Sequence, residues 1–485
     1  MTLVFLLLAS MLPGVFAGGL DFGPAFQNFR LTLEPGERME AAGPFFYSEQ
    51  AGERERWAFP PLWARETDSG IDSTEFDLSY PLLTYDRFGA DYRFQILQLF
   101  SFSGGESLTA TNKHRISLFP IYLQQRSADP NLNYTSVLPF YGTLKNRFFR
   151  DEVHYVMMPL YVHSKKRDVI TNNFLYPVFH VRRGQGLKGW QAWPLVGHET
   201  KTALAYTNNW GDTEINPGHE KWFALWPLFL DQRSGIGGTN AEHQQASIPL
   251  YSFTRSPLRD STSVPFALGV TYTVDRGKRY REIGAPWPLI VFRRGETANT
   301  SRVWPFYSHA TNEFLESTWY LWPVYKYNRV HSDPLDRERT RILLFLYSDI
   351  HDRNTESGTA VRRRDCWPLF THRRDRDGNE RLQVLALIEP VLPNNKSIER
   401  SYSPLWSLWR SEKNAQTGAS SQSLLWNLYR RERAPERSRT SALFGLFQRE
   451  KSGGRSRWRV FYIPFGKRPE AESPAVPTSP PAAAE

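Results

Sequence analysis

Short runs of apolar and aromatic residues recur along the chain at intervals of about 20 residues, which is typical of a repeat architecture. The clearest example is an eight-residue phrase at 403–410, 423–430 and 441–448, whose copies begin 20 and 18 residues apart. Each run is too short for a helix and shows no i, i+3, i+4 apolar stripe. The phrases are therefore predicted to be β-strands.

Alternate side chains of a strand point to opposite faces of the sheet. In the three phrases, one of the two faces is apolar throughout, while the other has a small or polar residue at its centre. In a membrane barrel the apolar face would meet lipid, and in a soluble repeat scaffold it would form the packed core. The predicted repeat-core aromatics are Trp406, Trp426 and Phe444.

The segments between the apolar runs are rich in glycine, charged residues and other turn formers, so hairpins are the natural connection. The sequence predicts an all-β fold: an antiparallel meander of about 20 one-strand repeats, closed in a barrel-like or propeller-like form. No significant helix is expected in the mature chain. The predicted organisation is a signal peptide over 1–17, an entry segment over 18–43, a single β-repeat domain over 44–466 and a disordered, Pro- and Ala-rich tail over 467–485.

Most of these runs contain a proline at their centre, as in Leu321-Trp-Pro-Val-Tyr325. Proline has no N–H group and is normally confined to strand ends, sheet edges or bulges. One interpretation is a kink at the same height in every strand. The other is that each phrase consists of two short strands joined at a proline corner, and the sequence leaves both open.

Residues 1–17 combine an apolar run with Val15-Phe-Ala17, a small-residue cleavage pattern, which predicts export. Cys366 is the single cysteine, so no internal disulfide framework is expected. An exported chain without disulfides is more typical of a bacterial envelope, and the predicted location is the outer membrane, the periplasm or the cell surface.

Positive charge is concentrated between Asp336 and Arg468, where 23 Arg and 4 Lys stand against 15 acidic residues. Solvated strand ends explain most charge runs. Arginine forks also suit phosphate groups, so anionic lipid or lipopolysaccharide is a second interpretation. The candidate contacts with such a surface are Arg362, Arg363, Arg364, Arg373, Arg374, Arg430 and Arg431. Nucleic acid is not an expected partner of an exported protein.

The chain has no nucleophile elbow, phosphate loop or metal-binding histidine motif. A non-enzymatic protein without cofactor or metal is therefore expected. The preferred hypothesis is an outer-membrane-type β-barrel with a structural, transport or envelope-assembly role. The alternative is a soluble or surface-associated β-repeat scaffold, propeller-like or built of stacked sheets, that binds lipid, glycan or protein partners.

Overall fold

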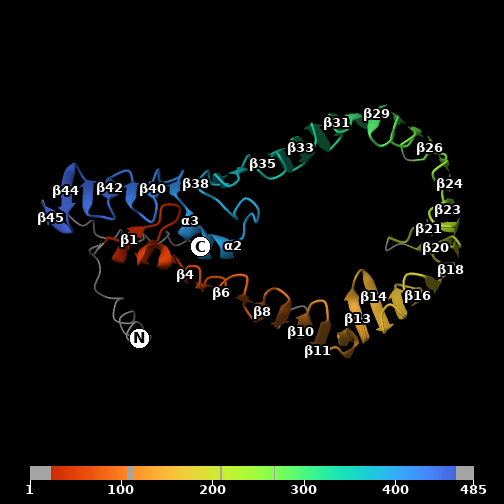
Figure 1. Ribbon diagram of the computed structural model, residues 1–485, viewed down its shortest axis with the longest axis horizontal. Coiled ribbons are helices and arrows are strands. Elements are labelled where there is room, and N and C mark those ends of the chain that lie inside the picture. Colours follow the sequence, from red (N-terminus) through yellow and green to blue (C-terminus); the bar gives the residue numbers. More distant parts are fainter. Residues whose placement is uncertain (1–22, 106–112, 208–209, 267, 466–485) are drawn as a thin grey trace, which may run out of the picture. The chain divides into compact units, whose positions relative to one another are not determined.

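The computed structural model describes residues 23–105, 113–207, 210–266 and 268–465. These residues form an antiparallel meander of about 45 strands, with 61% strand and 4% helix (Figure 1). The prediction of an all-β meander is confirmed. The predicted signal peptide (1–17) and the tail (467–485) lie outside the described residues.

The chain divides into two compact units. Unit 1 combines the residues up to Glu66 with those from Trp367 onward, and unit 2 comprises Thr67–Cys366. Unit 1 thus brings together two segments that are about 300 residues apart in the chain. The predicted entry segment (18–43) already contributes the first two strands of unit 1.

Unit 2 is a succession of short strands, most of them five to eight residues long, in which neighbours along the chain pair with each other except at β20 and β21; these two form a hairpin of their own, and β19 pairs with β22. Its elements are β6 (Ser73–Leu78), β7 (Leu83–Phe88), β8 (Asp91–Ile96), β9 (Phe100–Gly104), β10 (Lys113–Leu118), β11 (Tyr122–Ser127), η3 (Pro130–Leu132), β12 (Tyr134–Val137), β13 (Tyr141–Arg147), β14 (Arg150–Val156), β15 (Tyr161–Lys166), β16 (Val169–Phe174), β17 (Phe179–Gly184), β18 (Leu187–Ala192), β19 (Val196–Lys201), β20 (Leu204–Thr207), β21 (Thr213–Asn216), β22 (Gly218–Ala224), β23 (Phe229–Ile236), β24 (Glu242–Ser247), β25 (Tyr251–Arg255), β26 (Arg259–Val264), β27 (Val270–Asp275), β28 (Tyr280–Gly284), β29 (Ile290–Gly295), β30 (Ala298–Val303), β31 (Tyr307–Asn312), β32 (Leu315–Tyr320), β33 (Tyr325–Ser332), β34 (Leu335–Ile342), β35 (Tyr347–Asn354) and β36 (Ala360–Cys366).

Unit 1 contains strands from both ends of the described chain and two short helices. Its elements are η1 (Gly23–Ala25), β1 (Phe26–Arg30), β2 (Glu37–Ala41), η2 (Gly43–Phe45), β3 (Phe46–Ala51), β4 (Arg54–Phe59), β5 (Trp63–Asp68, which crosses the boundary with unit 2), β37 (Phe370–Arg374), β38 (Glu380–Val384), α2 (Lys396–Ser401), α3 (Ser403–Trp406), β39 (Trp409–Lys413), β40 (Ser420–Leu424), β41 (Tyr429–Arg433), β42 (Arg437–Ala442), β43 (Phe447–Ser452), β44 (Arg455–Val460) and β45 (Ile463–Phe465).

The aromatic–proline phrases are the turns of this meander. Residues 321–324 connect β32 to β33, and the strands pair directly on either side of them, with Tyr320 opposite Tyr325. The peptide bond between Trp322 and Pro323 is cis. Because proline has no N–H to give to a ladder, it is tolerated between strands and disfavoured within one.

The second interpretation of the proline is therefore the one that the structure adopts: two short strands joined at a proline corner. The prediction of one strand per repeat is wrong, since each period of about 20 residues contains a hairpin of two strands. In most of the described repeats the longest apolar run lies at the turn, and the strands on either side of it are mainly polar, so the apolar phrase marks the corner and not the strand.

Turns without proline occur at the same places and, like the proline turns, use left-handed backbone, which Leu321 (φ 45°) adopts ahead of Pro323. Leu343 and Leu344 have φ of 48° and 64° between β34 and β35, and Leu443 and Phe444 have φ of 51° and 55° between β42 and β43. Residues other than glycine rarely adopt this region. Corners with and without proline thus both place residues other than glycine in the left-handed region.

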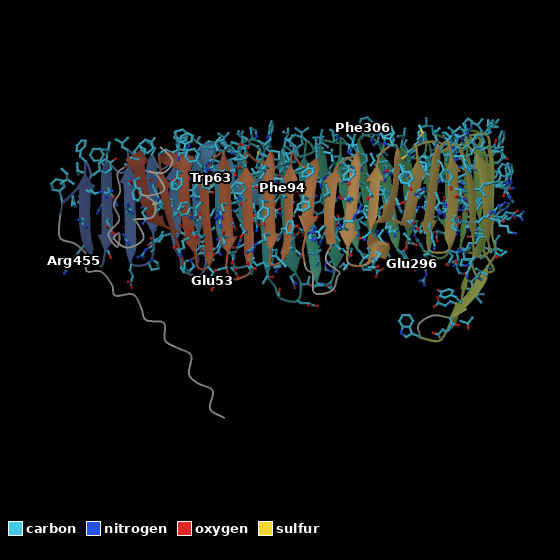
Figure 2. All side chains as sticks on the ribbon, turned by 90° about the horizontal axis from the view of Figure 1, so that it is seen from below. Glu53, Trp63, Phe94, Glu296, Phe306 and Arg455 are labelled. Carbon is cyan, nitrogen blue, oxygen red and sulfur yellow. The ribbon has the colours of Figure 1, made fainter. Side chains whose placement is uncertain are left out.

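Because the strands alternate in direction, every second turn of unit 2 lies at the same edge of the sheet. We name this the proline edge, and its turns in unit 2 include 79–82, 97–99, 119–121, 138–140, 157–160, 175–178, 193–195, 225–228, 248–250, 285–289, 304–306, 321–324 and 343–346. Figure 2 shows Phe306 at this edge of unit 2 and Glu296 at the opposite one, which we name the polar edge.

Unit 2 has a small apolar core. One cluster of buried side chains joins Tyr134, Leu144, Tyr155 and Val162 across neighbouring strands. Elsewhere the buried positions carry mainly small polar residues that bond across strands, as in the 2.8 Å contact between the hydroxyl groups of Ser263 and Thr271. Such cross-strand pairs stabilise a sheet locally and do not require a thick core.

Unit 1 is held together by contacts between its two chain segments, which lie alongside each other in Figure 1 as the red and blue strands. The hydroxyl group of Tyr47 on β3 donates a 2.8 Å hydrogen bond to the carbonyl oxygen of Arg400 on α2. The Nδ2 of Asn427 donates a 2.6 Å bond to Glu40 on β2. These side chains are buried, so the interior of unit 1 is strongly polar.

The first copy of the eight-residue phrase differs from the other two. Ser403–Trp406 forms the helix α3, whereas residues 425–428 and 443–446 are turns between strands. None of the three forms the strand expected from the alternation of its residues. The two described α-helices stand between β38 and β39, where the other repeats have a short turn.

Candidate functional site

The proline edge of unit 2 exposes large apolar side chains at nearly every turn. Phe119, Phe306 and Leu250 are 61%, 61% and 64% exposed, and Trp226 and Trp322 are both 48% exposed. None of the turns named above contains an Asp, Glu, Lys or Arg. Monomeric soluble proteins rarely present such a continuous apolar surface, which marks interaction sites when it occurs.

The rest of the sheet surface in unit 2 is mixed, with exposed Trp190 and Trp222 among polar side chains. The polar edge carries charged and glycine-containing turns such as 167–168, 276–279 and 296–297, although Phe149 and Phe314 are also exposed there. On β34, Arg337 and Arg339 lie on one face and Asp336 and Glu338 on the other. The named turns of the proline edge are therefore set apart by exposed apolar side chains without charged neighbours in the same turn.

A second candidate site is a cavity of about 340 Å³ inside unit 1, lined mainly by charged and polar side chains. One wall is a ladder of alternating charges across four strands: Arg38, Glu49, Arg56 and Glu66, here called the N-terminal ladder. Arg38 Nη1 lies 3.2 Å from Glu49, Arg56 Nη1 lies 3.0 Å from the same carboxylate, and Arg56 Nε lies 2.8 Å from Glu66. The strand spacing of a sheet makes such cross-strand pairs possible.

The other wall is a row of paired residues on β38–β41, here called the C-terminal ladder. Gln383 stands opposite Arg410, Arg410 opposite Ser423, and Ser423 opposite Arg430. The guanidinium carbon of Arg430 lies 3.5 Å from the centre of the Phe29 ring, which belongs to the N-terminal segment. Glu389 accepts hydrogen bonds from Gln383 and Trp406 at 2.7 and 3.1 Å.

The charges of the N-terminal ladder depend strongly on one another. Burial alone would raise the pKa of Glu49, but the guanidinium groups of Arg38 and Arg56 outweigh this effect and hold the pKa below its ordinary value. Burial would lower the pKa of Arg38, and the carboxylates of Glu40 and Glu49 reverse that effect, so this pKa is raised. Arg38 and Glu49 are therefore both charged at neutral pH.

Glu49→Gln is expected to destabilise the protein by about 2 kcal/mol at pH 7, because it removes a buried charged hydrogen-bond partner of two arginines. A carboxylate whose pKa is lower when folded contributes stability above its unfolded pKa and loses it as pH falls through the folded value. The difference between the wild type and the variant should therefore shrink below about pH 4.5. Urea unfolding at pH 7, 5, 4 and 3 checks this, and a pH-independent difference would contradict it.

The seven arginines predicted to contact an anionic surface lie in three different places in the structure. On β36 in unit 2, Arg362 forms a two-pronged contact with Asp349, at 3.1 and 2.7 Å; Arg364 lies 3.6 Å from the same residue, and Arg363 pairs with Asp365 at 2.6 Å. All three arginines thus form ion pairs with aspartates on the strands of the same sheet.

In unit 1, Arg373 and Arg430 line the charged cavity. Arg373 pairs with Glu399, and Arg430 with Glu432 at 2.6 Å. Arg374 and Arg431 lie one residue further along the same strands, β37 and β41, and do not line it. Binding of any of the seven arginines to an anionic surface stays a prediction.

The predicted repeat-core aromatics lie close to the corners of unit 1. Trp406 is half-buried at the end of α3, and Phe444 is half-buried in a turn. Trp426 is 38% exposed in the turn between β40 and β41, where its ring lies 5.9 Å from that of Phe45 and its indole N–H donates to the carbonyl oxygen of Leu405 at 3.0 Å.

Sequence reasoning missed Arg38, Tyr47, Glu49 and Arg410. Three of them lie near the N-terminus, where the apolar pattern is weak, but Arg54 and Arg56 show charges at strand spacing that could have indicated a charged sheet face. Arg410 ends the first copy of the eight-residue phrase, at the position equivalent to Arg430.

No group of three or more His, Cys, Asp or Glu residues in the described part of the chain is placed to hold a metal ion. Across the same residues, no helix is long and apolar enough to cross a membrane. No protein-family model matches the chain, and no curated protein matches it either. The fold and the two sites therefore define its class: a β-meander repeat protein with an apolar turn edge in unit 2 and a charged cavity in unit 1.

Proposed function

We propose that the protein is a non-enzymatic, exported scaffold of the bacterial cell envelope that associates with a lipid surface through its proline edge. The observation that supports this proposal is the line of exposed, uncharged turns in unit 2, which carry Trp, Tyr, Phe, Leu and Met side chains. The envelope location rests on the predicted signal peptide and the single cysteine.

Lipid suits this edge for two reasons. Aromatic side chains with one polar group, Trp and Tyr, favour the boundary between water and the acyl chains. Each corner also places its apolar side chains at the tip of a hairpin, as Trp322 lies between β32 and β33. Shallow insertion of such tips leaves the polar strands and their backbone ladders in water, so no unpaired backbone group has to enter the membrane.

The hypothesis of an outer-membrane-type β-barrel is less well supported than that of a surface-associated scaffold. A strand that crosses a bilayer needs about 9–11 residues, whereas the longest strands of unit 2, such as β33, have 8. Barrel strands also alternate between an apolar and a polar face, and β34 has charged residues on both faces. Closure of the meander in a barrel-like or propeller-like form stays a prediction on which this proposal does not depend.

The lipid partner is expected to be an envelope lipid, such as an outer-membrane phospholipid or lipopolysaccharide. A net charge of +10 favours membranes with anionic head groups. Charge attraction would supply only part of the binding free energy, because the turns that meet the lipid are uncharged. Glycan and protein partners remain alternatives that would bind without a bilayer.

Extraction from a membrane fraction tests this proposal. The protein is expected to stay bound in 1 M salt, because insertion of apolar side chains is not screened by salt as ion pairs are. Alkaline carbonate without detergent should release it, as it does for proteins that lie at the surface. Complete release by salt would contradict insertion of the proline edge, and release only by detergent would favour the membrane-spanning alternative.

A further inference from the structure

The charged cavity of unit 1 has more positive than negative side chains along its walls. Its lining includes nine arginines and one lysine against seven glutamates. At about 340 Å³ it falls in the usual range of small-molecule sites, which begins at about 300 Å³. The cavity lies wholly within unit 1, so it does not depend on the placement of unit 2.

The carboxylates that face the two ladders already have partners. Glu40 accepts hydrogen bonds from Arg38 and Asn427, Glu49 pairs with Arg38 and Arg56, and Glu66 pairs with Arg56. These carboxylates therefore already form ion pairs or hydrogen bonds with other side chains that line the cavity.

Two arginine side chains that line the cavity have guanidinium nitrogens without a hydrogen-bond partner among the described residues. The Nη2 of Arg38 is buried and makes no hydrogen bond with any described residue, although the side chain is 11% exposed overall. The Arg410 side chain makes no hydrogen bond or ion pair with the described part of the chain, and it stands between Gln383 and Ser423 on the C-terminal ladder. Burial, followed by the nearby charge of Arg38, lowers the pKa of Arg410 to about 10.

A partly buried cation without a partner, such as Arg410, is unfavourable for folding, and the nearby positive charge of Arg38 adds to that cost. Native proteins retain such groups where a ligand supplies the missing charge, and functional sites are often where stability is lost in this way. Guanidinium groups match phosphate oxygens in charge and geometry, and they form paired hydrogen bonds with them.

We propose that the cavity of unit 1 binds a phosphate-bearing anion between the guanidinium groups of Arg38 and Arg410. The free volume exceeds what a bare phosphate ion requires, so a phosphate ester with a small organic group also fits. The ester could be a free metabolite or the head group of a lipid, and both present the same chemistry to the two arginines. This site belongs to unit 1, whereas the proline edge belongs to unit 2, and the proposal does not rest on the proposed function of that edge.

Thermal unfolding of the full chain with added anions tests the site. The probes are inorganic phosphate, glycerol 3-phosphate and a short-chain phosphatidic acid below its micelle concentration, each compared with chloride at equal ionic strength. A ligand that binds only the folded state stabilises it by RT ln(1 + [L]/Kd), so the rise of the Tm with ligand concentration gives the Kd of each probe. Inorganic phosphate that binds at least as tightly as the short-chain lipid identifies a free anion, and tighter binding of the short-chain lipid identifies a head group.

Arg410→Gln is expected to weaken binding of the effective probe by at least tenfold. Without ligand, its Tm should equal or exceed that of the wild type, because a buried charge without a partner is removed. Arg431→Gln is the matched control, since it makes the same change on β41 at a position that does not line the cavity; its binding should be unchanged. Arg410→Lys keeps the positive charge but loses the planar guanidinium group, which can form two parallel hydrogen bonds with a phosphate. It should therefore weaken binding several-fold.

A wild-type Tm that responds to phosphate no more than to chloride would overturn the site. Equal binding by the wild type and by Arg410→Gln would overturn the role of Arg410 and indicate an adventitious ion only. If Arg410→Gln does not fold, Arg410→Lys and the wild-type titration still decide the matter. Loss of phosphate binding without loss of membrane association would separate this site from the proline edge.

Discussion

Replacing Trp226, Trp304 and Trp322 together by serine is expected to weaken binding to lipid vesicles by about 100-fold. All three side chains lie in turns of the proline edge and are between 45% and 48% exposed. Full burial of a large apolar side chain contributes about 1.5–3 kcal/mol. Because each indole is already about half buried, insertion should add about 1 kcal/mol per residue, and about 3 kcal/mol corresponds to a factor of about 100.

The matched control replaces three exposed tryptophans of unit 2 that lie away from the proline edge. Trp190 and Trp222 are within β18 and β22, and Trp210 is in the loop between β20 and β21. Their replacement by serine should change vesicle binding by less than threefold. Flotation with vesicles of phosphatidylethanolamine and phosphatidylglycerol at 0.15 M and 1 M salt gives the measurement. Equal losses in the two triple variants would contradict insertion through the proline edge.

Tyr47→Ala is expected to destabilise unit 1 by about 3–5 kcal/mol, the range found for removal of a large buried aromatic side chain. Tyr47 is 1% exposed and packs against Ala58 and Ala64. The guanidinium carbon of Arg38 lies 3.9 Å from the centre of its ring, and its hydroxyl group bonds to Arg400. The variant should therefore separate the two chain segments of unit 1 and open the charged cavity.

Two further variants divide this effect into its parts. Tyr47→Phe retains the ring and loses only the hydrogen bond to Arg400, at a cost of about 1 kcal/mol. Tyr141→Ala removes a tyrosine that is 59% exposed and should cost less than about 1 kcal/mol. Urea unfolding measures all three. A cost below 1 kcal/mol for Tyr47→Ala would show that the buried tyrosine does not hold the segments together.

The sequence predicts the fold class well and the strands poorly. The spacing of the phrases, their shortness and the turn residues between them are sufficient for an antiparallel β meander. The apolar phrases predict strands, but in this protein they are the corners. Many of the true strands, such as β34 with its alternating Asp, Arg and Glu residues, have no apolar face and so give no periodic apolar signal.

The proline edge was partly visible in the sequence. Proline at the centre of a phrase is incompatible with a central strand, and the absence of charge from the phrases is plain from the residues alone. The sequence pattern did not show that the chain reverses its direction at each phrase. Once every phrase reverses the chain, all phrases of unit 2 must lie on the same edge, because two strands separate one from the next.

The repeat, the all-β class and the concentration of apolar residues in short uncharged phrases were determined by the sequence itself, because they depend on spacing and residue type. The charged cavity was decided only by the tertiary structure. Asn427 and Glu40 are 387 residues apart in the chain and are joined by a hydrogen bond in unit 1. No local pattern records such a contact, since the positions of Arg38 and Arg410 relative to each other follow from the packing of two distant segments.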